Sequence, residues 1–248
     1  MKKLMLGCLL LGLALVMPPA LWAGSALDQA DAVYDKGGLE NIKMSLDLYL
    51  EALKNNPQDY ETNWKYARAH RDYGNEAKRK KVEGWQKICA EYGKRGMAYA
   101  KQAIDIASDK PDAHYYYGIS VGIYSDGVSI ITALREGLKD KTQSSFEKAY
   151  ALDKMYNEAG PILSLGRFWA VLPWPLKDKK DSLKYYREFQ QTPFFADNDE
   201  AHIFVAELLL DIGGGDNKAE AKKLLEKSAG ADDPYFGDWA KRLLEKEF

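Results

Sequence analysis

The side chains with the widest chemical range in this sequence are its histidines and cysteines, and there are few of them. His70, His114 and His202 are each expected in a separate helix, with no second ligand at metal-binding spacing. The sequence has no glycine-rich phosphate loop and no G-x-S-x-G motif, and a cysteine far from any histidine is not a nucleophile motif. The residue types therefore favour a protein that is not an enzyme and that needs no cofactor or metal.

The first 23 residues read as a secretory signal peptide. Lys2 and Lys3 precede an apolar run from Leu4 to Val16, and small residues follow at Ala23 and Gly24. We expect cleavage after Ala23, with Ala26 as the second choice. The run is too short to span a bilayer as a helix, so no transmembrane segment is expected in the mature chain. The protein is therefore predicted to be exported to the periplasm.

The two cysteines fall on either side of that cleavage site. Leu6-Gly7-Cys8 is similar to the end of a lipobox, but it lies inside the apolar run instead of after it, so no lipid anchor is expected. Cys89 is then the only thiol of the mature chain, which excludes an internal disulfide, and its helical spacing predicts a buried, inert thiol. Loss of Lys2 and Lys3 moves the formal net charge from −2 to −4, which argues against a nucleic-acid partner.

Small residues recur at positions where helices would cross. Gly96, Ala100 and Ala103 are three and four residues apart, so they share one stripe of a helix. After a turn at Ser108–Pro111, Tyr117 and Gly118 place a large and a small residue side by side on the next helix. Small residues at a crossing let two backbones approach, which is how antiparallel helix pairs pack.

The same pattern recurs along the chain. The small residues that follow each turn are Ala67, Gly118, Gly166 and Ala206, at separations of 51, 48 and 40 positions. The segments Glu51–Pro57, Pro111–Gly118 and Phe146–Asp153 resemble the tetratricopeptide (TPR) repeat, a helix–turn–helix of about 34 residues. We therefore predict an all-α, TPR-like helix–turn–helix α-solenoid with lengthened or inserted helices. Residues 24–248 are expected to form a single domain of this kind.

Helical periodicity and breakers give the expected elements. The expected helices are 26–36, 39–55, one that starts near Asp59 and stops at Gly74, a long one opened by the basic run Lys78–Lys81, one from Pro111, then 128–138, 142–152, 162–171, 181–190, 200–212 and 219–228. The segment Leu172–Pro175 is expected to be irregular because both of its prolines lack a donor. The final stretch, Asp238–Phe248, is predicted to be a capping helix.

The repeat register also predicts which side chains face the concave groove. If the four small residues are equivalent, the groove residues are Arg68, Ile119, Arg167 and Glu207, with Trp64, Tyr115, Leu163 and Ile203. The candidate binding residues among them are Trp64, Arg68, Tyr115 and Arg167, because arginine forms bidentate bonds to carboxylates and a ring supplies an apolar wall. The alternative is that the aromatic residues are ordinary core and that the arginines pair with neighbouring acids.

Longer segments carry a more specific resemblance. YETNWKYARAHRDYG, HYYYGISVGIY, LSLGRFWAVLPWP and DSLKYYREF, within about Tyr60–Gln190, resemble the T component of TRAP transporters. They are also similar to the eukaryotic regulators of microtubule dynamics. The first resemblance implies a periplasmic helical protein that associates with a solute-binding protein, in some members as a trimer. A general envelope-assembly scaffold, or a binder of an anionic solute through Arg68 and Arg167, stays open beside it.

Overall fold

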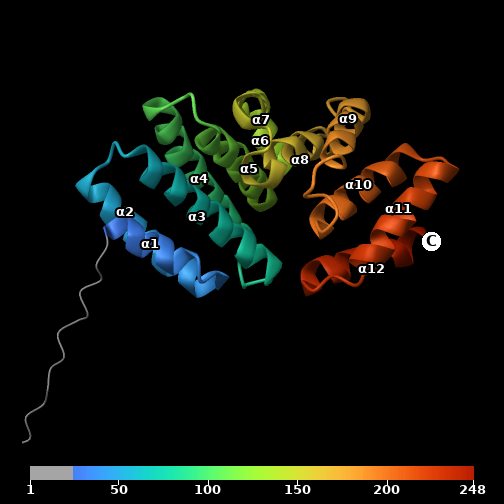
Figure 1. Ribbon diagram of the computed structural model, residues 1–248, viewed down its shortest axis with the longest axis horizontal. Coiled ribbons are helices and arrows are strands. Elements are labelled where there is room, and N and C mark those ends of the chain that lie inside the picture. Colours follow the sequence, from blue (N-terminus) through green and yellow to red (C-terminus); the bar gives the residue numbers. More distant parts are fainter. Residues whose placement is uncertain (1–24) are drawn as a thin grey trace, which may run out of the picture.

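The computed structural model describes residues 25–248, whose regular secondary structure is entirely helical (Figure 1). Within this range no strand is present, which confirms the all-α prediction. The signal peptide predicted for residues 1–23 lies outside the described residues. The twelve helices of residues 25–248 are α1 (Ala26–Tyr34), α2 (Gly38–Asn55), α3 (Tyr60–Arg79), α4 (Trp85–Ile106), α5 (Pro111–Val128), α6 (Ile130–Arg135), α7 (Leu138–Asp153), α8 (Tyr156–Val171), α9 (Lys179–Phe189), α10 (Asp199–Ile212), α11 (Gly215–Ser228) and α12 (Pro234–Glu247).

Local sequence explains where several helices begin. Ser25 forms a reciprocal capping box with Asp28 at the start of α1, and the Asp59 side chain accepts the Thr62 N–H at the start of α3. Pro111 and Pro234 occupy the first positions of α5 and α12, where a missing N–H costs no helical hydrogen bond. These caps fix where the four helices begin.

Several predicted boundaries are wrong. The expected helix 128–138 is interrupted at Ser129 and Gly137, which have positive φ and divide it among α5, α6 and α7, and α11 begins at Gly215 instead of at 219.

Two further errors involve α3. The helix does not stop at Gly74 but continues to Arg79. A Cβ at Gly74 would lie 2.7 Å from Ile123 Cγ2 of α5, so this glycine serves close packing instead of ending the helix. The basic run Lys78–Lys81 does not open the next helix either. It closes α3, where positive charge suits the carbonyl end of the helix dipole, and α4 begins only at Trp85.

The start of α8 departs from regular helix. Asn157, Glu158 and Ala159 have φ values of 48°, 60° and 59°, in the left-handed region that non-glycine residues seldom occupy. The regular part of α8 therefore begins near Pro161, close to the predicted start at Ile162. As predicted, the segment after α8 is irregular, with a cis bond between Trp174 and Pro175.

Consecutive helices pack against each other, with α3, α4 and α5 in the most extensive contact. Glycines allow the closest approaches. An added Cβ at Gly93 of α4 would lie 2.4 Å from the Tyr124 backbone nitrogen of α5. Gly118 of α5 and Gly166 of α8 are covered by the rings of Phe146 and Tyr186 respectively. The packing of small residues against large ones is therefore as the repeat pattern predicts, and each helix pair is joined to the next in a curved stack (Figure 1).

The core forms a series of clusters along this stack. Tyrosines dominate the first clusters, whereas Tyr186, Ile203 and Leu209 lie at the centre of the last one. Side chains of α12, among them Trp239 and Leu243, pack against that last cluster. The C-terminal helix therefore covers the end of the solenoid as expected, although it begins at Pro234, four residues earlier than predicted.

Candidate functional site

The concave face of the stack holds a groove of about 700 Å³. Helices α3, α5, α6, α7, α8, α10 and α12 all contribute side chains to it, so its walls come from both halves of the chain. Part of the lining is apolar: Ile119, Leu163, Phe168, Phe204, Phe236 and Trp239. A groove of this size lies within the range of ordinary ligand sites.

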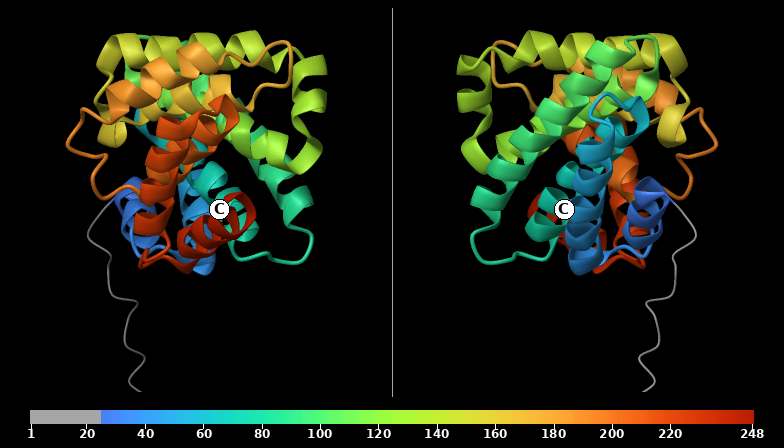
Figure 2. Two further views of the ribbon diagram at one scale, coloured as in Figure 1. Left: turned by 90° about the vertical axis from the view of Figure 1, so that its right-hand side faces the viewer. Right: turned by 90° about the vertical axis from the view of Figure 1, so that its left-hand side faces the viewer.

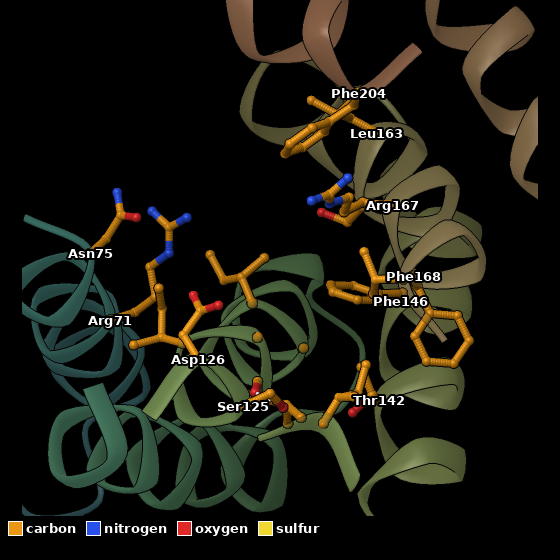
Figure 3. A pocket seen from close by; sticks show the side chains of 18 of the residues that line it. Arg71, Asn75, Ser125, Asp126, Thr142, Phe146, Leu163, Arg167, Phe168 and Phe204 are labelled. Atoms are coloured by element: carbon orange, nitrogen blue, oxygen red, sulfur yellow. Dashed lines mark hydrogen bonds between the residues drawn. The ribbon is translucent and has the colours of Figure 1, made fainter. Parts of the chain in front are cut away.

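Two arginines enter the groove from opposite walls. Arg71 comes from α3 and Arg167 from α8, and their guanidinium groups point toward the space between them (Figure 3). Arg71 Nη1 donates to Asp72 at 2.7 Å, while its buried Nε has no hydrogen-bond partner among residues 25–248. The side chain of Arg71 is 26% exposed, and that of Arg167 is 32% exposed. Both groups therefore keep donors available on the groove side.

Side chains of α10 and α12 hold Arg167 in place. Its Nη1 donates to Glu207 Oε2 at 2.7 Å, and its guanidinium lies 4.1 Å from the centre of the Phe204 ring. Trp239 Nε1 donates to the other Glu207 oxygen at 3.2 Å. Burial alone would lower the pKa of Arg167, but the attraction of Glu207 outweighs it and raises the pKa. The guanidinium is therefore positioned, and it is charged at any physiological pH.

Tyr115 lies on the α5 side of the groove and is 8% exposed. Its hydroxyl accepts a bond from Asn157 Nδ2 at 3.3 Å, and its ring meets those of Tyr116 and Tyr156 edge to face. Burial raises the pKa of the phenol, which keeps the hydroxyl neutral. Tyr115 is thus both core and lining, a combination that the sequence alone does not resolve.

The other polar lining is largely paired within the chain. Lys78 Nζ lies 2.7 Å from Asp126, and Lys139 Nζ lies 3.0 Å from Asp140. The side chains of Asn75 and Glu200 make no hydrogen bond within the described range, but the Glu200 carboxylate attracts the guanidinium groups of Arg71 and Arg167 without forming a close ion pair. The lining groups open to a ligand are therefore the free donors of the two arginines, an amide and a carboxylate.

The comparison with family models shows to which protein family the chain belongs. Residues 26–171, more than half of the chain, match the family described as regulator of microtubule dynamics protein 1-3. The chain belongs to this family. No curated protein matches it.

Solved structures show the same fold at low sequence identity. The thermophilic TPR protein TTC0263 of Thermus thermophilus has a TM-score of 0.62 at 18% identity, over 88% of this chain and 97% of that one. Two structures of MamA have TM-scores of 0.53 and 0.51 at 16% and 15% identity, over 84% and 88% of this chain and 94% and 95% of theirs. The TPR-type solenoid predicted from the small-residue pattern is therefore confirmed.

In this member of the regulator of microtubule dynamics family, the four predicted binding residues fall into two pairs. Tyr115 and Arg167 line the groove, whereas Trp64 and Arg68 lie outside its lining, among the N-terminal helices. The Trp64 ring stacks on Tyr116 at 5.6 Å. Their role in binding stays a prediction, but the surroundings of Trp64 and Arg68 fit the alternative of core packing and internal ion pairs.

The Arg68 guanidinium is enclosed by the chain itself. It lies 4.0 Å from the centre of the Tyr34 ring and 3.6 Å from Asp31 Oδ1, and it donates to the Tyr49 hydroxyl at 3.2 Å. Helices α1 and α2 supply these partners. Arg71, one helical turn further along α3, takes the groove position instead.

Sequence reasoning missed Arg71, Asn75 and Glu200, and also the α12 side chains that close the groove. Arg71 follows Arg68 by three residues on the same helix, so the spacing could have indicated it. No comparable local signal points to Tyr235, Phe236 or Trp239. They reach the groove only because the whole stack curves.

The histidines and the cysteine lie in the core. His114 Nε2 lies 3.0 Å from the Ser108 carbonyl and His202 Nδ1 lies 3.1 Å from Ser228 Oγ, while both nitrogens of His70 lack a hydrogen-bond partner among residues 25–248. Over the same range no cluster of three or more potential metal ligands occurs. Cys89 is fully buried, and burial raises its pKa to about 11.

No helix between residues 25 and 248 has the length and apolar character needed to cross a membrane.

Proposed function

We propose that this protein is a non-catalytic scaffold that binds a segment of a partner protein in its concave groove. The observation that carries the proposal is the pair Arg71 and Arg167, which face each other across an apolar groove within a TPR-type solenoid. TPR-type neighbours support protein binding as the general role. The identity of the partner is a further part of what we propose.

The groove chemistry favours a segment that carries carboxylates. A guanidinium presents donors in a fork that matches a carboxylate, and each groove arginine has spare donors beside its internal partner. The apolar lining, for example Leu163 and Phe204, suits an aliphatic or aromatic neighbour of that carboxylate. Asn75 and Glu200 supply further polar contacts to an extended backbone.

The N-terminal sequence and the TRAP resemblance support the compartment and the partner that we propose. The Lys2-Lys3 start, the apolar run and Ala23 support export to the periplasm through a cleavable signal peptide. In that compartment we propose an accessory role in TRAP-type solute uptake, with a solute-binding protein as partner and a trimer as the assembly. The family's name describes an action on microtubules, and we propose that the shared property is the way of binding a protein.

The proposal is tested by photo-crosslinking in periplasmic extract. A benzophenone amino acid replaces Ser164, which lines the groove, in the chain from Gly24 onward. The matched control replaces Lys94, an exposed α4 residue outside the groove. We expect a crosslinked solute-binding protein from Ser164 and none from Lys94. Equal yields at the two positions, or no product at Ser164, would contradict binding in the groove.

Two outcomes would change the finer assignment only. An envelope-assembly protein crosslinked at Ser164 would replace the transport role with a general scaffold role. Loss of the crosslink in the presence of a small dicarboxylate would indicate that the groove binds anionic solutes. Because Arg71 and Arg167 would hold either kind of ligand, Arg167→Ala should weaken the binding of the partner segment and of the dicarboxylate alike.

A further inference from the structure

The C-terminal end of α3 contacts the start of α12 across the open side of the solenoid. Arg79, the last residue of α3, forms an ion pair with Asp233, which lies 154 residues further on and caps α12. The Arg79 guanidinium also lies 5.2 Å from the centre of the Tyr235 ring and 5.1 Å from that of Phe236. Both side views place α12 and the α3–α4 turn at the lower end of the molecule (Figure 2). One arginine thus connects the N-terminal half of the stack to its last helix.

This contact turns an open groove into a ring. Arg79, Tyr235 and Phe236 are themselves part of the groove lining, opposite the wall formed by α8. In Figure 1 the C-terminal end of α3 and the start of α12 lie opposite each other on the open side of the curved stack, which would stay open without this contact. With it, the space in front of Arg71 and Arg167 is bounded on every side in the plane of the ring.

We propose that Arg79 is a latch that closes the groove and thereby selects which partner segments enter it. A helix with side chains is about 10–12 Å wide and rises about 5.4 Å a turn, so one turn fills roughly 500 Å³. The groove of about 700 Å³ lies within the size range of small-ligand sites, so a helix of several turns exceeds it. An extended chain threads through the closed ring, whereas a helical segment enters only after the latch opens.

The latch contacts are weak enough to open. The Arg79 and Asp233 side chains are 24% and 39% exposed, so solvent screens their attraction. The two ring contacts add modest cation–π attraction. Glu76, 3.8 Å away on the same helix, helps to keep the guanidinium in position. Together these contacts favour the closed form by roughly tenfold, which leaves an open minority in solution.

The test measures the distance between the two sides of this contact and needs no partner. Spin labels are attached through Lys87→Cys at the start of α4 and Asp238→Cys on α12, both at exposed positions, with the native Cys89 buried. Pulsed electron resonance then gives the distribution of label distances. Arg79→Glu reverses the latch charge. Lys80→Glu makes the same charge change one residue away, where the only ion-pair partner within residues 25–248 is Glu76.

We expect one short distance in the parent chain and in Lys80→Glu, and a longer distance that holds most of the population in Arg79→Glu. Identical distributions in all three chains, at unchanged helix content, would overturn the proposal. If Arg79→Glu does not fold, the parent chain in 1 M salt is the second measurement. There the Debye length falls to about 3 Å, so the longer distance should gain population, and an unchanged distribution would count against the latch.

The selection of partner segments rests on the proposed function, whereas the closed form is tested by a conformational readout that needs no partner. The distance measurement tests the latch whatever partner the groove binds. A closed ring with no crosslink at Ser164 would reject the proposed function alone.

Discussion

Two glycines of α5, one helical turn apart, should respond in opposite ways to the same added methyl group. Gly118 lies under Phe146, and a Cβ there would be 2.3 Å from the ring carbon Cε1. Gly122 is exposed, and no atom lies within 4 Å of the Cβ position. The variants Gly118→Ala and Gly122→Ala therefore separate packing from helix propensity within a single helix.

The magnitudes follow from two opposing effects. Replacing glycine by alanine inside a helix stabilises it by about 0.5–1 kcal/mol, and this gain applies to both positions. At Gly118 the methyl must displace a ring that is only 5% exposed and that packs against Phe168 and Leu165, and overpacking of this kind costs about 1–3 kcal/mol. We expect a net loss of about 1–2 kcal/mol for Gly118→Ala and a gain of about 0.5–1 kcal/mol for Gly122→Ala.

The assay is urea unfolding followed by the helical circular dichroism signal. The two variants change the unfolded chain in the same way, so the difference between them reports the folded state. For a chain of this length each kcal/mol corresponds to about 2–4 °C in melting temperature, which provides a second measure. If both variants shifted in the same direction by the same amount, the close approach of α5 to Phe146 would be refuted.

Two buried titratable groups give the remaining predictions. Burial lowers the pKa of His70 from 6.5 to about 3, so its contribution to stability is complete above pH 6.5 and is lost as the pH falls toward 3. At about pH 4 the loss is roughly 3 kcal/mol, and urea unfolding of His70→Phe should show a smaller acid loss than the parent; equal losses would contradict this. The buried Cys89 thiol, with its pKa raised to about 11, should react with a thiol reagent only after denaturant is added. Rapid labelling of the folded chain would contradict its burial.

Much of the fold could be predicted because the packing rule is local. A small residue at a crossing needs a large one from the neighbouring helix, and both kinds are visible in the sequence. Gly166 beneath the fully buried Tyr186 is an example, since Gly166 and the stripe that contains Tyr186 are both recognisable from spacing alone. The same rule failed at Gly74 because glycine also ends helices, and only the approach of Ile123 distinguishes the two uses.

The candidate site was less predictable because it depends on which face of each helix its neighbours cover. Arg167 and Tyr115 reach the groove in the predicted register. Arg68 occupies the equivalent position in its own repeat, but Tyr34, Asp31 and Tyr49 surround it, since α1 and α2 pack on that side. A register inferred from one repeat therefore transfers to another only where the same neighbours are present.

Closure of the groove lies beyond any local pattern. In a solenoid each repeat contacts its neighbours, and the overall curvature is the sum of small rotations from one repeat to the next. A few degrees at each crossing decide between an open horseshoe and contact between α3 and α12. The meeting of Arg79 with Asp233 is the result of that sum over α3 to α12, so no pairwise spacing in the sequence encodes it. The small rotations at all the helix crossings add up at the position of this contact. A weak ion pair there can therefore decide whether the groove is open or closed.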